Sequence, residues 1–588
     1  MTQPHSRPGP APQIVQPAGF EGRAGFALAA FAMVVAMVML LDRVGAPARL
    51  VSLMPLCLGL AGLATAGIVS RTMQVSQFYT GGRCVAAASL AMALSAPLLA
   101  MALPALPPVA GQPGLATLMA GLAGGLFLAG FATGPMLRKS GAFSLAGLLA
   151  GRFPGTGLPL ACMAVAAALS FLLALAGLAL ATAMLVMATG LSRPGAAVVL
   201  CVALILIAVP GGLRGVTRVA GDAFGLAAGG VGVALALRHI AREPLPLPGI
   251  GDSAAMMAAL VRMADWPGVA APLVISPVLA SALAIGLGCL PALVAGFAAL
   301  PRAGASRRAG LLALAATGLV LAGAIALIAA AVNGLDRDMI GRKPDMLPAY
   351  AYAASGRGLM PVCGQNVANP AEAAAACARL PGFGGVIRAQ DLAPGSTALL
   401  LGMTQPPQAL TSVIVAALAA LGLALAAGSL QALATIIAHD GLHRARQSRA
   451  MTSRRLAIAR IVLIAACTSA AAIAATQALD PRLLSGVAVL ASAALLAPVL
   501  LLVVWPLATS RDALLALVAG GLALIAQTGE FLRADADSAA RAALAAAGCA
   551  VAAGVVASLF HRRRDAGAGF LHALVRRGPD VLPPDPAA

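Results

Sequence analysis

Charged and aromatic residues are both scarce in this sequence. Asp, Glu, Lys and Arg make up 10% of its 588 residues and aromatic residues 3%, whereas 60% are hydrophobic. About a quarter of the residues of a typical soluble protein are charged, so this composition excludes a soluble multidomain enzyme and a disordered chain. The 65 glycines and 40 prolines exclude a coiled coil. An all-α polytopic membrane protein remains.

Motifs that bind nucleotides or metals are missing as well. The glycine-rich stretches lie inside apolar runs and match no phosphate-binding loop, kinase signature or hydrolase nucleophile elbow. The net charge of +19 comes largely from arginines in short loops between apolar runs, which is topology information rather than a nucleic-acid-binding face. We therefore expect no enzymatic activity, no cofactor or metal and no nucleic-acid partner. The expected partners are membrane lipid and a small organic solute, with the oligomeric state left open.

Long apolar runs occupy most of the chain. A membrane-spanning helix needs roughly 20 residues, and the runs bounded by charged residues predict about fourteen such helices. They lie near residues 26–42, 50–69, 87–105, 115–136, 158–188, 195–212, 216–238, 271–297, 308–334, 409–438, 456–476, 482–506, 513–529 and 540–560. The first run lacks a cleavage site of small residues, so we expect a retained helix rather than a signal peptide.

The distribution of basic residues predicts the orientation. With the N-terminus in the cytoplasm, 24 of the 39 Lys and Arg residues fall on the cytoplasmic side, and six of the other 15 lie in the long loop 335–408. This bias follows the positive-inside rule. We expect a protein of the bacterial inner membrane with both termini in the cytoplasm. The expected organisation is a tail (1–25), two peripheral helices (26–70), a ten-helix core (71–506), two further helices (507–560) and a second tail (561–588).

The long loop 335–408 also holds two of the nine cysteines, Cys363 and Cys377. The other seven lie in or beside apolar runs, where small buried thiols are ordinary packing. The orientation places the loop outside the cytoplasm, in an oxidising compartment. We therefore expect a disulfide between Cys363 and Cys377.

Two apolar runs carry helix-breaking residues in their interiors. The run 89–106 contains Pro97 and Pro104, and the run 274–293 contains Gly286 and Gly288 between two prolines. Pro and Gly are common in transmembrane helices, which explains any single kink. These two runs, however, are the first and sixth of a ten-helix block, the spacing of a five-plus-five inverted repeat with a site at the repeat interface. Proton pumps, which need chains of ionisable residues at mid-membrane depth, are excluded by the near absence of such residues.

Several motifs in the order of one family support a transporter. They are "FYTGGR" (78–83), "LRKSGAFSLAGLLAGRF" (137–153), "VPGGLRGVT" (209–217), "CLPALVAGFAALPRAGASRRAG" (289–310), "AGSLQALATIIAHDGL" (427–442) and "LLAPVLLLVVWPLATSRDALLAL" (495–517). Together they resemble the sodium/solute symporter family, particularly its cation/acetate branch, over roughly residues 70–560. The resemblance implies a LeuT-type fold with a five-plus-five inverted-repeat core. It also implies alternating-access cotransport of a small organic anion.

The resemblance also implies site residues, some of which depart from the family pattern. The sodium ion is held in the family by two carbonyls of the first core helix, here Ala96 and Leu99, and by hydroxyls of the eighth, here Leu421, Ala424 and Leu425. Because these three have no hydroxyl, either another ion is coupled, or Ser412 or Ser429 takes the role, or this mechanism is lost. The substrate is expected beside Ser95, Ala96, Ala100, Ser281, Gly286 and Gly288. The family also usually has an Asp where this chain has Gly147.

Three ionisable residues at or inside predicted membrane helices are candidates for a function. Asp222 is the one carboxylate that we place within the membrane; it is either a proton-coupling, ion-binding group or a partner of Arg218 four residues earlier. His439 and Asp440 end the eighth core helix as a cap or as a gate.

These observations predict a cation-coupled symporter that uses Na+ or H+ to transport a short-chain monocarboxylate such as acetate. The alternative is a transport-inactive relative that acts as a membrane sensor or assembly partner.

Overall fold

The computed structural model describes residues 20–106, 114–153, 155–240, 275–356, 360–388, 391–392, 408–444, 452–531 and 536–560. The described residues form helices and connecting turns, with two isolated β-bridges and no strand among them. The second tail, 561–588, and residues 1–19 of the first tail lie outside this description.

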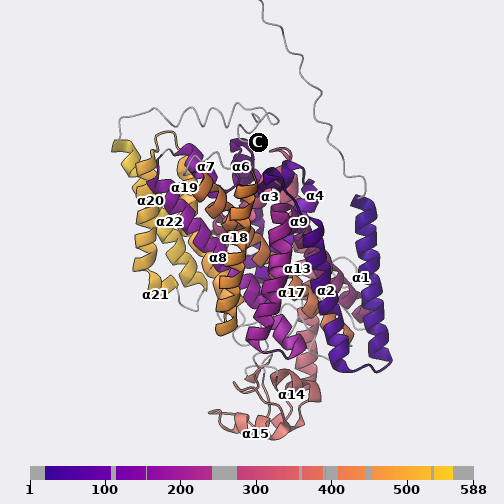
Figure 1. Ribbon diagram of the computed structural model, residues 1–588. Coiled ribbons are helices and arrows are strands. Elements are labelled where there is room, and N and C mark those ends of the chain that lie inside the picture. Colours follow the sequence, from indigo (N-terminus) through magenta and orange to yellow (C-terminus); the bar gives the residue numbers. More distant parts are fainter. Residues whose placement is uncertain are drawn as a thin grey trace, which may run out of the picture.

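The described residues form thirteen long helices that pack side by side (Figure 1). In chain order they are α1 (Phe20–Arg43), α2 (Ala48–Val69), α4 (Ala87–Ala105), α5 (Leu115–Leu128), α8 (Gly157–Thr189), α9 (Arg193–Ile240), α11 (Pro277–Gly288), α13 (Ala305–Met339), α17 (Gln408–Ala434), α18 (Thr452–Thr476), α19 (Pro481–Val504), α20 (Ser510–Ala526) and α22 (Ala536–Phe560). Shorter helices lie between them or extend them: α3 (Val75–Thr80), η1 (Gly81–Arg83), η2 (Ala129–Thr133), α6 (Gly134–Ser140), α7 (Leu145–Arg152), α12 (Pro291–Gly296), η3 (Phe297–Ala299) and η6 (Thr435–Arg444).

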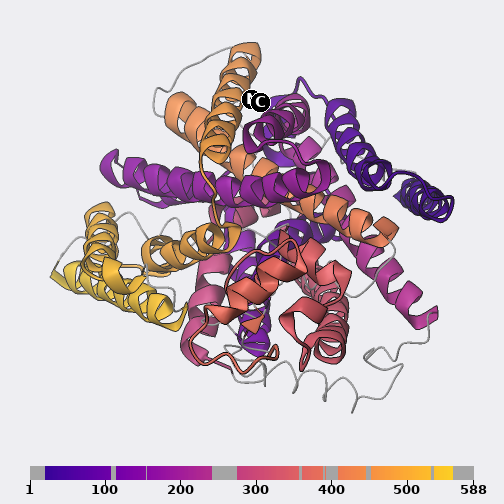
Figure 2. The same ribbon diagram turned by 90° about the horizontal axis from the view of Figure 1, so that it is seen from below.

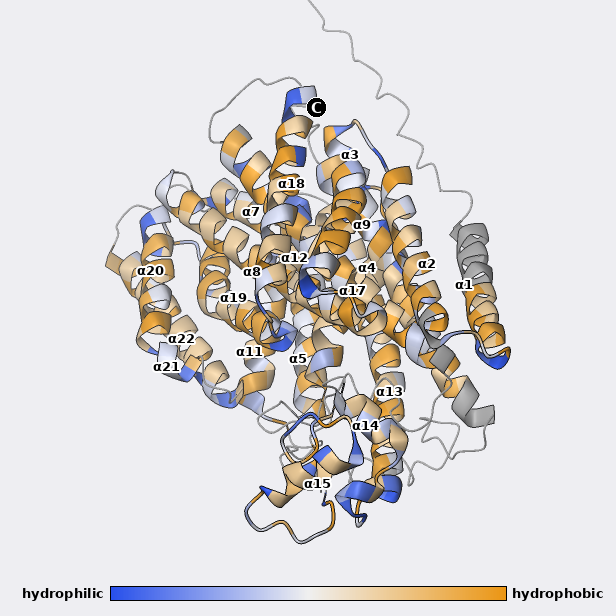
Figure 3. Cartoon of the chain, turned by 60° about the horizontal axis from the view of Figure 1, so that its bottom comes forward, coloured by the Kyte–Doolittle hydropathy of each residue, from blue (hydrophilic) through white to orange (hydrophobic). Residues whose placement is uncertain are grey.

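Ten described helices are long and apolar enough to cross a membrane, or eleven if α11 and α12 form one bent span. Hydrophobic residues cover the outer faces of these helices, and hydrophilic residues gather at their ends and in the loops (Figure 3). Leu319 and Phe560, for example, are large apolar side chains that are 77% and 84% exposed. Outward-facing apolar side chains on long helices fit a lipid environment. The prediction of fourteen spans is not settled by these ten or eleven helices and stays a prediction.

Helix α9 covers two of the predicted runs. Its 48 residues contain Pro210 and a kink at Gly212, where φ is +55° and ψ is −141°. A Cβ atom at Gly212 would lie 2.5 Å from the Phe78 carbonyl oxygen, so this backbone conformation and this close approach both require glycine. The kink divides α9 where the sequence predicted the boundary between 195–212 and 216–238.

Two groups of helices form the centre of the molecule. Helix α4 packs on α13 and α5 packs on α11, whereas α8, α9, α17 and α18 pack on one another. Helices α8 and α17 meet at Gly177 and Gly422, where a Cβ atom on either residue would lie 2.5 or 2.6 Å from the other's carbonyl oxygen. Small residues of this kind let membrane helices approach closely. The two groups meet where α4 contacts α9 and α17 and where α12 contacts α17.

The predicted breaks differ between the two runs. Helices α11 and α12 are bent by 42° around residues 289–290, as the sequence predicted. Helix α4 in contrast continues from Ala87 to Ala105 with both prolines inside, so the predicted interruption of this helix is wrong. Proline removes one hydrogen bond without ending a membrane helix when neighbouring helices support it. Helices α9, α13 and α17 all pack against α4.

A small domain projects from one end of the helices. Its short helices α14 (Ala349–Gly356) and α15 (Pro370–Ala378) follow α13 and lie at the bottom of Figure 1, and Figure 2 shows them from below. Cys363 and Cys377 form a disulfide there, with their Cα atoms 5.1 Å apart. Tyr352 lies inside the domain, and its hydroxyl donates to the Pro344 carbonyl at 2.8 Å.

Candidate functional site

A cavity of about 50 Å³ lies where the two helix groups meet. Residues of four helices form most of its lining. They belong to the first half of α4, to α9 just after its kink at Gly212, to α12 and to the last part of α17. Its walls are mostly apolar, with Leu90, Leu94, Pro97, Leu213, Val216, Ala220, Leu293, Ala424 and Ala432 among the lining residues. This half of the bundle lies opposite the disulfide-bearing domain (Figure 1).

Gln431 on α17 is the central polar group of this cavity. Its side chain is buried, and its Nε2 donates to the Phe78 carbonyl at 3.2 Å. Because only the NH2 end of the amide can donate to a carbonyl oxygen, this contact fixes which end of the amide is nitrogen. The other end, Oε1, is buried without a hydrogen-bond partner among the described residues. An unpaired buried acceptor costs about 1–3 kcal/mol, and Gln431 is the one described lining residue whose side chain has such an atom.

The other polar groups of the lining are mainly acceptors. The Thr217 hydroxyl donates to the Arg214 carbonyl at 3.1 Å, and the Thr435 hydroxyl donates to the Gln431 carbonyl at 2.9 Å. Both hydroxyl protons are thus used, and their oxygen lone pairs remain. Pro97 has no N–H, so the Ala93 carbonyl one turn earlier lacks its helical donor. Ala93 and Pro97 both line the cavity.

Tyr79 on α3 connects the cavity to an aromatic and acidic cluster, the mouth cluster (Tyr79, Phe143, Ser144, His439 and Asp440). The ring centroids of Tyr79 and Phe143 lie 5.3 and 4.3 Å from that of His439. His439 Nδ1 lies 3.0 Å from Asp440 Oδ1, and the Ser144 hydroxyl donates to the Asp440 carboxylate. Burial raises the pKa of Tyr79 above its ordinary value, and Arg455 lowers it by a smaller amount. The phenol therefore stays protonated and able to donate.

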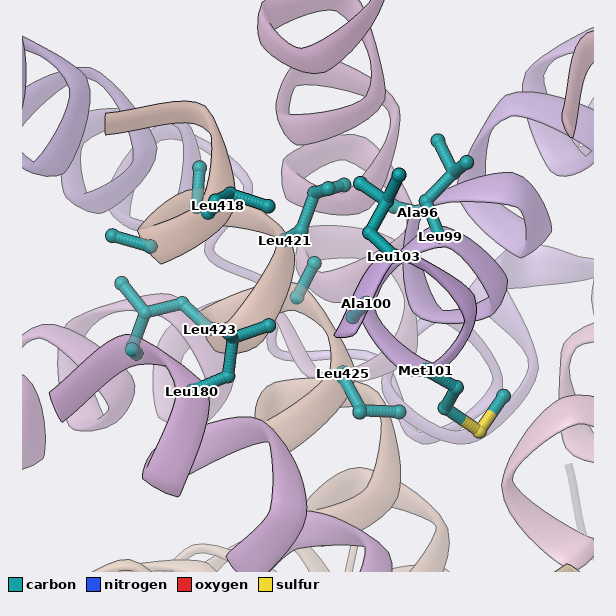
Figure 4. Close-up of a cluster of buried hydrophobic side chains, with 14 of the residues drawn as sticks. Ala96, Leu99, Ala100, Met101, Leu103, Leu180, Leu418, Leu421, Leu423 and Leu425 are labelled. Carbon is teal, nitrogen blue, oxygen red and sulfur yellow. The ribbon is translucent and has the colours of Figure 1, made fainter. Parts of the chain in front are cut away.

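Buried apolar side chains follow the cavity along α4 and α17. They include Leu99 and Leu103 of α4 and Leu421 and Leu425 of α17, of which Leu421 lies nearest to α4 and Leu425 faces Gly177 of α8; we call these four the leucine cluster (Figure 4). The drawn side chains carry no oxygen or nitrogen. The positions at which the resemblance placed a cation, Ala96, Leu99, Leu421, Ala424 and Leu425, are all buried in or beside this cluster, and Ala424 also lines the cavity. None of these five residues has a side-chain oxygen, and the carbonyls of Ala96 and Leu99 lie within the continuous helix α4.

The predicted substrate residues do not line the cavity. Ser95 is buried, and its hydroxyl donates to the carbonyls of Ala91 at 2.9 Å and Ala313 at 3.3 Å. Ala96 and Ala100 are buried in the same region, whereas Ser281 is exposed on the outer side of α11.

Gly286 and Gly288 are contact points between helices. A Cβ atom at Gly286 would lie 2.1 Å from the Val489 carbonyl oxygen, and one at Gly288 would lie 2.7 Å from the Leu128 side chain. The Gly288 carbonyl, freed by the bend, accepts a hydrogen bond from the Thr133 hydroxyl at 2.8 Å. The bend therefore satisfies its own polar group without an added ligand. The role of these six residues in substrate binding stays a prediction.

The remaining candidates lie outside the cavity. Asp222 and Arg218 are exposed on α9, and Asp222 is turned away from the α9 face of Val216, Thr217 and Ala220 that lines the cavity. Ser412 is buried at the start of α17. Ser429 is buried two turns after Gly422 and shares its face, which packs on α8.

Sequence reasoning missed Gln431, Thr217, Thr435 and Tyr79. All four stand inside the motifs described above, but none is a carboxylate, a lysine, an arginine or a histidine. Gln431 carried a signal, because it is an amide in the middle of the uncharged run 409–438. A buried amide must find partners for its oxygen and its nitrogen, and the oxygen of this one has none among the described residues.

The fold is similar to that of a solved membrane transporter. No protein-family model matches the chain, and no curated protein matches it in sequence. A solved structure of a Na+-coupled sialic acid symporter, substrate-bound and outward-open with a novel Na+ site, matches with a TM-score of 0.63. The match covers 87% of this chain and 98% of that chain at 17% sequence identity. The likeness shows the fold and confirms the predicted all-α, LeuT-type fold class.

Proposed function

We propose that this chain is a secondary active transporter that moves a small organic solute across a membrane by alternating access. The observation that carries the proposal is the position of the cavity. It lies where the helix group of α4 and α12 meets that of α9 and α17, and the leucine cluster follows it along α4 and α17. Sites at such interfaces change their exposure when one group of helices rocks against the other.

The coupling ion is a cation, either Na+ or H+, as the fold similarity supports. A hard cation binds several oxygens, and the positions expected from the resemblance offer carbon side chains. A sodium ion therefore needs ligands other than Leu421, Ala424 and Leu425. The oxygen-bearing side chains nearest to those positions along α17 are Ser429 and Gln431.

The resemblance implies a short-chain monocarboxylate such as acetate as the solute. The volume of the cavity supports a solute of this size, since about 10–15 Å³ of such space holds one water molecule. Sugars and other large solutes exceed the space of about 50 Å³.

A second candidate is a transport-inactive protein that acts as an assembly partner or membrane sensor. The apolar filling of the expected cation region favours it. Uptake of labelled acetate and of labelled acetamide into proteoliposomes separates the two candidates, with an inward Na+ gradient, an inward H+ gradient or neither. Gradient-driven uptake of either solute supports the transporter. No uptake of these or of a wider panel of small solutes under any gradient supports the inactive protein.

A further inference from the structure

We infer that the cavity binds a small neutral solute that donates hydrogen bonds, such as a primary amide, in preference to a carboxylate anion. Transport of this solute rests on the proposed function. Its binding follows from the chemistry of the cavity walls.

The polar groups of the cavity walls are mainly hydrogen-bond acceptors. Gln431 Oε1 is buried and unpaired among the described residues. The Ala93 carbonyl receives no helical hydrogen bond from residue 97, because Pro97 has no N–H. The hydroxyls of Thr217 and Thr435 already donate to carbonyls and offer lone pairs. Tyr79 provides a phenol that can donate. An acceptor-rich wall with one hydroxyl donor fits a ligand with N–H or O–H groups and one acceptor. A carboxylate has acceptors only.

The charge of a solute must also suit the cavity walls. None of the described residues that line the cavity is Lys, Arg, His, Asp or Glu. An anion in an apolar cavity without a cation or several donors pays a large desolvation penalty. The start of α12 offers few donors, because Pro291 has no N–H and the N–H groups of Leu293 and Val294 already donate to the Leu290 carbonyl at 3.1 and 3.0 Å, which leaves the N–H of Ala292 in this turn. The cavity walls therefore favour a neutral solute.

The size of the cavity limits the solute to a few non-hydrogen atoms. A cavity of about 50 Å³ holds about four water-sized groups. Acetamide has four non-hydrogen atoms, one NH2 donor group, one acceptor and a methyl group for the leucine and alanine walls. Acetate has the same shape but a negative charge and no donor. The two molecules therefore test charge and donor capacity at constant size.

The experiment is saturation-transfer NMR of acetamide and acetate with the full chain in lipid nanodiscs. A ligand of four non-hydrogen atoms binds weakly, so millimolar titrations are appropriate. We expect saturable acetamide binding that acetate does not displace at equal concentration. Gln431→Met keeps the length of the side chain but removes the amide, and it is expected to weaken the binding of acetamide about fivefold or more. Thr217→Val removes a second acceptor and should also weaken the binding of acetamide.

The control is Thr182→Val on α8, whose buried hydroxyl has no hydrogen-bond partner among the described residues and does not line the cavity. It should bind acetamide like the original chain. Tighter binding of acetate than of acetamide, or acetamide binding unchanged in both Gln431→Met and Thr217→Val, overturns the inference. Binding of acetamide that depends on Gln431, without uptake in proteoliposomes, would support the inference and contradict the proposed transport. Failure of the inference and failure of the proposed function are therefore distinguishable.

Discussion

The Ser144 hydroxyl donates a hydrogen bond to the Asp440 carboxylate, which joins two segments 296 residues apart. Ser144 is the N-cap of α7, and its oxygen also accepts from the Gly147 amide at 3.0 Å. Asp440 lies in η6, the continuation of α17. The contact therefore fixes the short helix α7 to the end of a helix that lines the cavity.

Ser144→Ala is expected to lower the stability of the protein by about 1–3 kcal/mol. The variant removes a helix cap and leaves a buried carboxylate without one donor. Thermal unfolding in detergent measures the effect. Ser144→Thr is the matched control, since it keeps the hydroxyl. Equal unfolding temperatures for Ser144→Ala and the original chain would show that the contact adds no stability.

Gly147→Asp is expected to destabilise the protein, and Asp440→Asn is expected to reverse much of the loss. A Cβ atom at Gly147 would lie 3.0 Å from Asp440 Oδ1, so the new carboxylate would face an existing one. Like charges at this distance repel strongly in a buried site. A double-mutant cycle on unfolding temperatures checks the coupling. Additive effects of the two substitutions would contradict it.

Thr133→Val is expected to destabilise the bend between α11 and α12 by about 1–3 kcal/mol, because it leaves the buried Gly288 carbonyl without its donor. Thr133→Ser keeps the hydroxyl and should remain near the original stability. Hydrogen–deuterium exchange of residues 286–294 locates the change. Faster exchange spread evenly over the whole chain would argue against a local role of Thr133.

Cys377→Ser is expected to destabilise the domain after α13. A disulfide that closes a loop of about 15 residues contributes about 3 kcal/mol, and Cys363 and Cys377 are 14 positions apart. Limited proteolysis should then cut within residues 357–392 while the membrane helices stay intact. The same protease resistance with and without reductant would contradict a stabilising disulfide.

The helices were largely predictable from the sequence, because long apolar runs between charged residues have few other solutions. The run 87–105 is found as α4 (Ala87–Ala105), and the bend after Gly288 follows its Gly and Pro pattern. The continuity of α4 was not predictable, because support from neighbouring helices decides whether Pro97 breaks it. The cavity was missed for a related reason. It is assembled from four parts of the chain that are distant in sequence (α3 with α4, α9, α12, and α17 with η6), and its buried unpaired group, Gln431, is uncharged.

The measurement that tests alternating access most directly is the accessibility of the leucine cluster from the two sides of the membrane. Ala96→Cys places a small thiol beside the cluster, in a chain whose exposed or half-buried Cys57, Cys84, Cys201 and Cys549 are replaced by serine. A membrane-impermeant thiol reagent is then added from either side, under each ion gradient. Ala432→Cys, in the cavity wall, is the matched control and should react from the side opposite the disulfide-bearing domain.

Alternating access predicts that Ala96→Cys reacts from the side of the disulfide-bearing domain at a rate that changes with the Na+ or H+ gradient. If Ala432→Cys reacts while Ala96→Cys stays protected from that side under every gradient, the leucine cluster is a permanent barrier, and the account of this protein as a transporter is wrong.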